Sequence, residues 1–576
     1  MPLKFTSADD YQWSVRKIAV VGPGIVGMPM AALLAHAAIR IGTDQPAHVV
    51  VLQRASATSG WKVAAINRGE SVIGGVEPAL DEITRESVRA GRLSASHDYA
   101  AARDADVVLV SVQTDKRGFG PDYGPLFEAL EGLAAALRER PPGNVPVVCF
   151  ESTLAPSSMQ TLVREFFAKR GLEEGRDILL GNSPNRVMPG RLVERVAGSD
   201  KLVAGLHPLT PKLIATLYSH IVTKGSLHST NSTTAEVVKT LENAYRDVRI
   251  AFAAEIVRYC DAHDIDFYAV REAVNARLAQ SDAASGSATA VPSGALLVPT
   301  VGVGGHCLPK DGILLWWRRI ESGADTSNSL ILESRRINDA SPAATLTLAE
   351  RDLGSLEGRR IALLGVAYRF DSEDTRNSPT LALARLLAAR GIGFTLHDPY
   401  VRPGDQNLER AAMAERFTND LGAALAVAEL AIVCTGHGVY ARDLAGLHAA
   451  APKLSGIVDA ANVWRRADVE ARGLAYTGIG RGRKPPLAAF VDFVQRSFEA
   501  VERGVADEVA ALGSFLNERY ARDVFNEVRF ETVRAIAATC PTGCAIVAAG
   551  QPITAPVFEG FRSHLACCAQ AARATA

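Results

Sequence analysis

A short apolar segment followed by three spaced glycines is the feature that most constrains the fold of this chain. Residues 17–35 read KIAVVGPGIVGMPMAALLA, in which Gly22, Gly24 and Gly27 follow a strand-like run and precede a helix-like one. Glycines at this spacing let the backbone approach a pyrophosphate that lies on the first turn of the helix. The segment therefore predicts a strand–turn–helix unit that binds a dinucleotide.

The next strand ends without the carboxylate that usually binds the adenosine ribose hydroxyls. The segment HVVVLQR ends in Gln53-Arg54, and Ser56 follows shortly. A guanidinium in place of the acid is the arrangement expected around a ribose 2′-phosphate, which favours NADP. The alternative is an irregular strand end with NAD held elsewhere, and these residues leave both interpretations open.

Further apolar strands alternate with helical patterns in two blocks of the chain. The first block contains ADVVLVSVQT, PVVCFESTLAPSS and DILLGNSPNRVMPGR, and the second contains RRIALLGVAYRF, ELAIVCTG and SGIVDAANVW. Strands separated by helices form sheets with helices on both faces, so each block predicts a doubly wound α/β domain. We expect Rossmann-like domains at 1–225 and 346–480, a central helical region at 226–345, and a mostly helical extension at 481–576.

The central region opens with a long helical pattern that starts at about Thr233. Lys239, Asn243 and Arg246 lie at i, i+4 and i+7, on one face of the predicted helix. Apolar residues occupy several of its other sides, which indicates a buried helix. A buried lysine needs a partner, such as an anionic group of a ligand.

A cysteine follows the glycine-rich loop of the segment VGVGGHCLPKD, residues 301–311. Cys307 stands three residues before Lys310 and four before Asp311. Glycines allow close backbone approach to a ligand, and a nearby lysine favours the thiolate, which can attack an electrophilic carbon. A small buried cysteine in a tight turn is the alternative, and this segment alone does not separate the two.

Composition excludes several classes of protein. The 576 residues are 48% hydrophobic and 22% charged, with a net charge of -1, which gives no basic field for nucleic acid. No apolar run approaches membrane-spanning length, and the N-terminus lacks the features of a signal peptide. The eight cysteines follow no regular framework and indicate reduced thiols. We expect a soluble cytoplasmic protein that binds neither nucleic acid nor membrane.

The last part of the chain, 481–576, combines a helix pattern with scattered cysteines. Apolar residues between Phe490 and Leu516 recur mostly at helical spacing, which predicts an amphipathic helix. Cys540, Cys544, Cys567 and Cys568 follow, with His564 among them. Their spacing departs from that of metal sites, so we favour plain buried thiols and expect no metal.

Taken in order, the motifs resemble those of the nucleotide-sugar 6-dehydrogenases, the family of UDP-glucose, GDP-mannose and UDP-N-acetylhexosamine dehydrogenases. The match runs over roughly residues 15–480 through GPGIVG, SVQT, ESTLAP, SPNRVMPG, the helix with Lys239 and Asn243, GVGGHCLPKD and GVAYRFDSEDTRNSP. The GGHC form and EST in place of a bare ST look more like the N-acetylhexosamine branch. The other branches usually carry serine before the cysteine.

The resemblance implies a four-electron oxidation of the sugar's C6 alcohol to a uronate. Cys307 would trap the aldehyde as a thiohemiacetal, which a second oxidation converts to a thioester. Lys239 and Asn243 would stabilise the developing oxyanion. Asp311 would orient water or handle protons together with Lys239, and Thr153 would hold that water or the nicotinamide side. The middle helix would form the interface of a homodimer or larger homo-oligomer.

The resemblance also assigns ligand contacts. The expected contacts of the cofactor, NAD or NADP, are Gly22, Gly24, Ile25, Val26, Gly27, Gln53, Arg54, Thr114, Ser152, Lys310 and Arg376. The expected contacts of the nucleotide sugar, favoured as a UDP-sugar, are Arg186, Arg246, Thr300, Gly302, Gly304, Tyr368 and Arg369.

Two departures from the family pattern bear on the chemistry. Asn185 follows Pro184 where the family usually has a glutamate that assists thioester hydrolysis. An amide cannot act as a base, so hydrolysis is slow or depends on Asp311 alone. The SVxTP motif is replaced by a sequence ending in Thr114-Asp115, which alters the wall near the cofactor. The extension after residue 480 has no counterpart in the family.

Three alternatives to this function stay open. In the first, the substrate is UDP-glucose or another nucleotide sugar. In the second, oxidation stops at the aldehyde because Asn185 replaces the glutamate. A non-catalytic regulatory protein is the third, and the retention of Cys307, Lys239, Asn243 and Asp311 argues against it.

Overall fold

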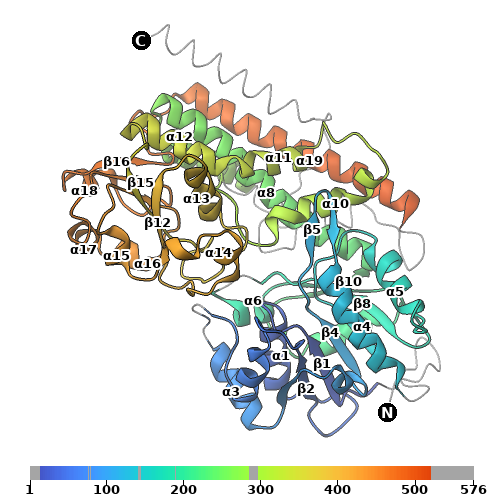
Figure 1. Cartoon of the computed structure of the whole chain (residues 1–576). Coiled ribbons are helices and arrows are strands. Elements are labelled where there is room, and N and C mark those ends of the chain that lie inside the picture. Colours follow the sequence, from blue (N-terminus) through green and yellow to red (C-terminus); the bar gives the residue numbers. More distant parts are fainter. Residues whose placement is uncertain are drawn as a thin grey trace. The chain divides into compact units, whose positions relative to one another are not determined.

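The computed structural model of the chain describes residues 13–74, 77, 79–140, 145–187, 190–284 and 296–520. These residues form two compact units (Figure 1). The first unit takes the residues up to Glu242, Ile313–Ala324 and those from Val509 on, and the second takes Asn243–Gly312 and Asp325–Glu508. The cysteines near the C-terminus and His564 lie outside the described residues.

The first unit contains an eight-stranded sheet in the order β10-β9-β8-β7-β4-β1-β2-β3. Its strands are β1 (Lys17–Val21), β2 (His48–Leu52), β3 (Leu93–Ser96), β4 (Val107–Val110), β7 (Val147–Phe150), β8 (Leu179–Asn182), β9 (Lys201–Gly205) and β10 (Leu227–Asn231). All neighbouring strands are parallel except β8 and β9, which are antiparallel. The predicted Rossmann-like class is confirmed, with this one reversal at the β9–β10 edge.

Helices cover both faces of this sheet. They are α1 (Gly27–His36), α2 (Trp61–Asn67), α3 (Leu80–Arg89), η1 (Tyr99–Ala102), α4 (Gly124–Arg138), η2 (Met159–Val163), α5 (Arg164–Ala168), α6 (Leu192–Gly198) and α7 (Thr210–Tyr218). Side chains of a strand alternate between faces, and so Ile18 and Val20 of β1 enter one apolar core while Ala19 and Val21 enter the other. A short hairpin, β5 (Asp115–Arg117) and β6 (Gly120–Asp122), precedes α4.

The second unit contains a six-stranded parallel sheet in the order β13-β12-β11-β14-β15-β16. Its strands are β11 (Arg360–Leu364), β12 (Gly393–His397), β13 (Phe417–Thr418), β14 (Leu430–Val433), β15 (Gly456–Asp459) and β16 (Ala475–Gly478). The helices between them are α13 (Pro379–Ala389), α14 (Gln406–Arg410), η3 (Ala414–Arg416), α15 (Leu421–Leu425), α16 (Gly438–Arg442), α17 (Leu444–Ala449) and α18 (Arg466–Glu470). The second predicted α/β domain is therefore confirmed as Rossmann-like.

Among the described residues, six helices do not connect strands within either sheet. They are α8 (Ser232–His263), α9 (Phe267–Ala284), α10 (Leu308–Glu321), α11 (Leu330–Asp339), α12 (Ser341–Leu353) and α19 (Ala488–Arg519). Helices α8, α10 and α19 contribute residues to both units. Most residues of α8 are buried, as its sequence pattern predicts.

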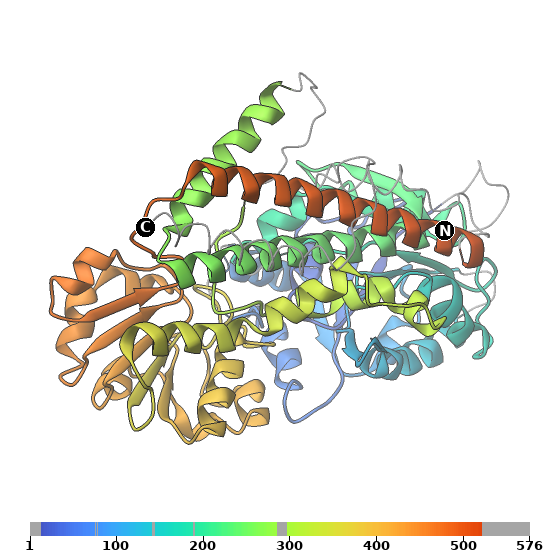
Figure 2. The same cartoon turned by 90° about the horizontal axis from the view of Figure 1, so that it is seen from above.

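Helix α19 is the amphipathic helix predicted in the extension, and within the second unit it lies beside α8 (Figures 1 and 2). The rings of Phe498 and Phe252 are 5.7 Å apart, and those of Phe490 and Tyr259 stack at 5.1 Å. The hydroxyl of Tyr245 donates a hydrogen bond to Glu502. Within the second unit, α19 is thus packed against α8 through its apolar stripe.

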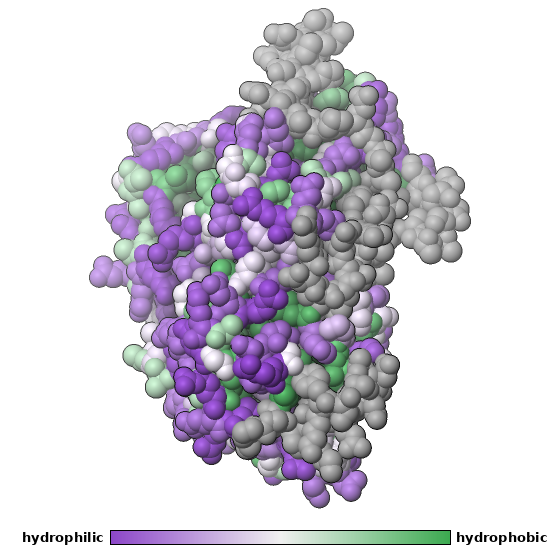
Figure 3. Space-filling model, turned by 90° about the vertical axis from the view of Figure 1, so that its right-hand side faces the viewer, coloured by the Kyte–Doolittle hydropathy of each residue, from purple (hydrophilic) through white to green (hydrophobic). Residues whose placement is uncertain are grey.

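The molecular surface is mixed in character. Figure 3 shows a face on which hydrophilic side chains predominate and apolar ones lie in scattered patches. In the part of the chain that the structure describes, no helix combines the length and the hydrophobicity that crossing a bilayer requires.

We predict that replacing Phe498 with alanine lowers the free energy of unfolding by about 3–5 kcal/mol, because it opens a cavity between α19 and α8. Urea titration followed by circular dichroism measures this. The matched control is Phe119→Ala, since Phe119 is 61% exposed, and this change should shift the free energy by no more than about 0.5 kcal/mol. Equal effects of the two changes would mean that α19 is not packed as described.

Candidate active site

The glycine loop between β1 and α1 has the geometry of a dinucleotide cradle. Gly22 has a φ of +94°, and Gly27 lies so close to it that a Cβ at Gly27 would stand 2.0 Å from the Gly22 oxygen. A Cβ at Gly24 would meet nothing within 4 Å. The open space at Gly24 and the helix N-terminus after Ile25 and Val26 fit the pyrophosphate of NAD.

The end of β2 carries the residues that the sequence places near the adenosine ribose. The side-chain amide of Gln53 donates to the Ser59 hydroxyl at 2.9 Å. Arg54 pairs with Glu128 at 2.6 Å, and both side chains are more than half exposed. A surface pair of this kind is weak and opens easily, so the Arg54 guanidinium can turn toward a ligand at the β2 end.

Thr114, Ser152 and Thr153 lie together at the ends of β4 and β7. The Thr114 hydroxyl donates to the Thr153 carbonyl at 2.7 Å, and the Ser152 hydroxyl donates to the Val112 carbonyl at 2.6 Å. Strand β1 with its glycine loop is the next neighbour of β4 in the sheet. These polar groups therefore stand at the carboxyl edge of a parallel sheet, where ligands bind in α/β folds.

Asn185 belongs to a buried polar network. Its amide donates to the Glu151 carboxylate, and its side-chain oxygen accepts from Lys201 at 3.1 Å. Lys201 also bonds Glu151 at 2.9 Å, and the Tyr218 hydroxyl donates to the other oxygen of the same carboxylate. Burial raises the pKa of Glu151, and the positive charge of Lys201 acts against that rise. Asn185 is thus a neutral bridge in a network that already holds one carboxylate and one ammonium.

Arg186 is buried against a carboxylate of α8. Its guanidinium pairs with Glu242 at 2.6 Å and donates to the Asp200 carbonyl at 2.8 Å. A contact of Arg186 with the substrate stays a prediction, and it would have to share this guanidinium with Glu242.

Lys239 lies on the buried part of α8. Its side chain is 6% exposed. Within the described ranges, no hydrogen-bond acceptor is found for its ammonium. Because this largely buried side chain ends in an ammonium that no described residue pairs with, Lys239 is a candidate to hold an anionic group of a ligand.

Cys307 stands immediately before α10 in the second unit. Of the four cysteines that the structure describes, Cys149, Cys260 and Cys434 are buried and Cys307 is only half-buried. The backbone N–H of Gly305 donates to the Arg376 carbonyl at 2.8 Å, and the Asn377 amide donates back to the Gly305 carbonyl at 2.9 Å. These reciprocal bonds fix the cysteine loop against the loop that follows β11.

Tyr368 packs flat against the glycines of the cysteine loop. A Cβ at Gly304 would lie 2.3 Å from the Tyr368 Cβ, and one at Gly302 would lie 3.1 Å from Pro379. Close packing of the two loops therefore requires glycine at Gly304, while a Cβ at Gly302 would need Pro379 to shift by a few tenths of an ångström. Burial raises the pKa of Tyr368, so its hydroxyl stays protonated.

Two arginines flank Tyr368 in this part of the second unit. The guanidinium of Arg369 lies 5.2 Å from the ring centre of Phe370. Arg376 pairs with Asp374 at 2.5 Å. The structure therefore places Tyr368 and the backbone of Arg376 against the cysteine loop, whereas the guanidinium of Arg369 contacts its neighbour Phe370.

Asp311 is a fully buried carboxylate one turn into α10. It accepts from the Asn243 amide at 2.6 Å and from the Lys310 ammonium at 2.5 Å. Lys310 is buried as well, and its ammonium is engaged in this ion pair. Its expected contact with the cofactor would require the ion pair with Asp311 to open. Asn243, Asp311 and Cys307 thus gather around the start of α10.

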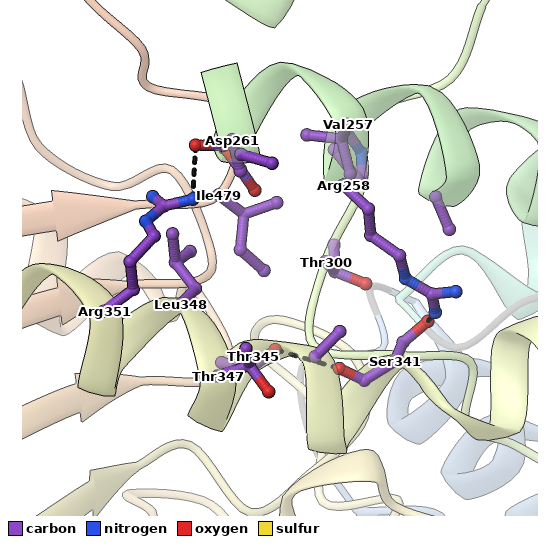
Figure 4. Close-up of a pocket in the computed structure, with 14 residues that line it drawn as sticks. Val257, Arg258, Asp261, Thr300, Ser341, Thr345, Thr347, Leu348, Arg351 and Ile479 are labelled. Atoms are coloured by element: carbon purple, nitrogen blue, oxygen red, sulfur yellow. Dashed lines mark hydrogen bonds between the residues drawn. The ribbon is translucent and has the colours of Figure 1, made fainter. Parts of the chain in front are cut away.

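Thr300 lines a cavity of about 310 Å³ whose walls are mostly apolar (Figure 4). Residues of α8 and α12, Pro299 and Ile479 form the rest of its wall. The Thr300 hydroxyl donates to the Gly302 carbonyl at 2.9 Å. Arg246 follows Asn243 on α8 and is half-buried. Their expected substrate contacts stay predictions.

Several residues of these networks escaped the sequence analysis as side chains with a role. Glu151 was visible only as a letter of the EST motif, and Lys201 and Tyr218 carried no local signal because they come from later strands and helices. Glu236, whose carboxylate accepts backbone N–H groups of Ser157 and Met159, looked like an ordinary helix residue. Across the described residues, no group of His, Cys, Asp and Glu is arranged to hold a metal ion.

Comparison with protein families assigns most of the chain. Residues 16–222 match the NAD binding domain of the UDP-glucose/GDP-mannose dehydrogenase family. Residues 233–340 match its central domain, and residues 362–466 match its UDP binding domain. The glycine loop lies in the first match, the cysteine loop in the second and Tyr368 in the third.

Individual relatives agree with this assignment. A UDP-N-acetyl-D-mannosamine dehydrogenase from Pyrococcus horikoshii is 29% identical over 471 residues, 81% of this chain and 99% of the relative. A protein of the same name from Yersinia pestis is also 29% identical, over 78% of this chain and all of the relative. About a fifth of this chain therefore has no counterpart in them.

Solved structures show the same likeness. The NDP-N-acetyl-D-galactosaminuronic acid dehydrogenase of Methanosarcina mazei Go1 is 31% identical, covers 81% of this chain and 96% of its own, and superposes with a TM-score of 0.63. The Pyrococcus horikoshii UDP-D-ManNAc dehydrogenase structure gives a TM-score of 0.66 at 29% identity, over 81% of this chain and 99% of its own. The chain belongs to the UDP-glucose/GDP-mannose dehydrogenase family and is an NAD-dependent nucleotide-sugar dehydrogenase.

Proposed function

We propose that this protein oxidises the C6 hydroxyl of a UDP-N-acetylhexosamine to the uronate in two successive steps at one site. The relatives named UDP-N-acetyl-D-mannosamine dehydrogenase support the N-acetylhexosamine, and the match to a UDP binding domain supports the uridine nucleotide. The GGHC sequence at 304–307 and Glu151 before Ser152 favour the same branch.

The observation that carries the proposal is the setting of Cys307. Its thiol is the half-buried one among the described cysteines, and it stands at the N-terminal end of the fourteen-residue helix α10. The positive end of a helix dipole favours an anion at this place. A thiolate there can attack an aldehyde carbon and hold the intermediate covalently.

The proposed sequence of bonds is balanced by two oxidations and one hydrolysis. The C6 alcohol loses a hydride and a proton and becomes an aldehyde, and the Cys307 sulfur adds to that carbon to form a thiohemiacetal. Loss of a second hydride and proton gives the thioester. Water then cleaves the carbon–sulfur bond, which releases the uronate and restores the thiol. Each of the two oxidations would transfer its hydride to a separate NAD molecule, bound in turn at the cofactor site.

The chain's own polar groups supply the remaining functions. The ammonium of Lys239 and the amide of Asn243 stabilise the oxyanion, and one such donor typically contributes about 3–4 kcal/mol. Asp311 orients water or takes up protons. Thr153 holds that water or the nicotinamide side.

The cofactor site bears on the choice between NAD and NADP. The protein uses NAD through the glycine loop. Because the amide of Gln53 stands where the acidic residue usually lies and Arg54 is held only by a surface pair with Glu128, we propose that NADP is accepted as well, with the Arg54 guanidinium turning from Glu128 to the 2′-phosphate.

The proposed assembly and location follow the family resemblance. We retain 1–225 as the cofactor domain, 226–345 as the central region of a cytoplasmic homodimer or larger homo-oligomer, 346–480 as the nucleotide-sugar domain and 481–576 as the extension. Because Phe252 of α8 is covered by Phe498 of α19, a partner subunit would contact another face of α8. Light scattering tests this, and a monomeric mass would contradict it.

We predict that the purified protein forms two reduced cofactors per UDP-N-acetylhexosamine consumed, with uronate as the product. Cys307→Ser should lower turnover by roughly three orders of magnitude or more, as loss of a catalytic nucleophile does. The measurement counts NADH, and in parallel NADPH, against product for a panel of UDP- and GDP-sugars.

The matched control is Cys260→Ser, because Cys260 is a buried thiol of α8 and this change should leave the ratio at two. One reduced cofactor per sugar, with free aldehyde, would show that oxidation stops halfway. Full turnover of Cys307→Ser would remove the covalent mechanism.

We also predict that Asn185→Glu destabilises the fold in a pH-dependent way. It adds a second carboxylate to a buried network in which Lys201 already neutralises Glu151, and an uncompensated buried charge costs roughly 3–5 kcal/mol. The added carboxyl would have a raised pKa in the folded state, so its penalty is absent at low pH and grows as pH rises.

Urea titrations at pH 5 and pH 8 measure the difference. Asn185→Gln is the matched control, because it adds the same length without charge and should show little change with pH. Equal stability of the two variants at pH 8 would contradict the charge balance described for this network.

A further inference from the structure

The loop that carries Ser152 and Thr153 contains a strained residue held from several sides. Ser157 is fully buried and has a φ of +76°, in the left-handed region that favours glycine. A non-glycine residue keeps such a conformation only where its surroundings fix it. The question is which groups hold this loop, because its position sets the position of Thr153.

One of these groups is the carboxylate of Glu236 on α8. It accepts the backbone N–H of Ser157 at 2.7 Å and that of Met159 at 2.9 Å. Glu236 is 2% exposed, and burial raises its pKa to about 8. A buried acid of this kind is costly to the fold, and the two backbone N–H groups that it accepts offset part of that cost.

A second group reaches the same residue through its side chain. Nε of Arg318 donates to the Ser157 hydroxyl at 2.8 Å, and a terminal nitrogen of Arg318 donates to the Thr161 hydroxyl at 2.7 Å. The Tyr123 hydroxyl accepts the N–H of Ala155 at 2.7 Å. Glu236 therefore holds the backbone of this segment, Arg318 holds its hydroxyls, and Tyr123 holds the backbone at Ala155.

Glu236 and Lys239 lie on the same face of α8. The two residues are three positions apart on α8, so their side chains project from neighbouring positions on one face of the helix. The carboxylate that fixes the loop after Thr153 is thus one helical step from the ammonium that lacks a protein partner in the described part of the chain.

We propose that Glu236 is a positioning residue that sets Thr153 in register with Lys239 by holding the loop 152–158 against α8. This proposal rests on the function proposed above, which assigns the roles of Thr153 and Lys239. The carboxylate of Glu236 faces the loop and not a ligand in this proposal, because both of its oxygens accept backbone N–H groups. It acts through the backbone N–H groups of Ser157 and Met159. Residue 236 must therefore offer one oxygen acceptor to each of these two groups.

The test is Glu236→Gln, which keeps the size of the side chain and replaces one acceptor oxygen with an N–H₂ group that repels a backbone N–H. We expect kcat to fall about 100-fold, as displacement of catalytic groups by about 1 Å does, while KM for the nucleotide sugar changes little. Hydrogen–deuterium exchange of the segment 152–163 should rise in the same variant.

The matched control is Glu174→Gln. Glu174 is also a buried carboxyl with a pKa raised by burial to about 8, and it accepts a backbone N–H, that of Leu180, at 2.6 Å. It should keep the wild-type kcat and the wild-type exchange of segment 152–163. An equal loss of kcat in both variants would mean that any buried acid of this unit matters equally, and would overturn the proposal.

A second variant covers the case in which Glu236→Gln does not fold. Ser157→Gly accepts the positive φ and keeps the N–H that Glu236 binds, but it loses the hydroxyl that Arg318 binds. We expect wild-type stability with a kcat lowered roughly tenfold, a smaller displacement than that of Glu236→Gln.

The exchange measurement separates the two proposals, because it needs no turnover. Raised exchange in Glu236→Gln with an inactive wild-type protein would leave the loop anchor standing and remove the proposed function. Unchanged exchange and unchanged kcat would overturn the role of Glu236 even if the wild-type protein oxidises a UDP-sugar.

Discussion

The desolvation of charged side chains along α8 is the constraint on which the rest of the structure depends. A helix this deeply buried must give each ionised group a partner, because an unpaired buried charge costs several kcal/mol. Glu236 finds backbone N–H groups and Glu242 finds Arg186. Asp247 finds Arg335. Lys239 is largely buried and pairs with no other described residue, and in the proposed function its partner is the oxyanion of the substrate.

The residues proposed for the reaction are held in place differently in the two units. In the first unit, the cofactor loop and Thr153 stand on strand ends, and buried groups such as Glu236 fix their position. In the second unit, the cysteine loop is fixed by close packing of glycines against Tyr368 and by backbone bonds to the loop after β11. Both arrangements hold their residues on rigid elements, and the proposed covalent chemistry requires such fixed positions.

The parts that the sequence predicted were those with a local cause. The glycine loop follows from backbone access at Gly22 and Gly24, the helices α8 and α19 follow from 3.6-residue periodicity, and Cys307 was set apart by its glycine-rich neighbourhood. The reversal of β9 against β8 could not be predicted, because strand direction depends on a long connection rather than on the strand's own residues. The ion pair between Lys310 and Asp311 and the network around Asn185 likewise depend on which distant side chains share a buried space.

Trapping the thioester that we propose on Cys307 tests its covalent role most directly. The protein would be mixed with a UDP-N-acetylhexosamine and NAD, quenched with acid within one turnover, and mapped by peptide mass spectrometry. Because Asn185 supplies no base for hydrolysis, we predict that a uronyl adduct accumulates on the peptide that contains Cys307. Two equivalents of NADH formed with no adduct on Cys307 at any quench time would contradict the account.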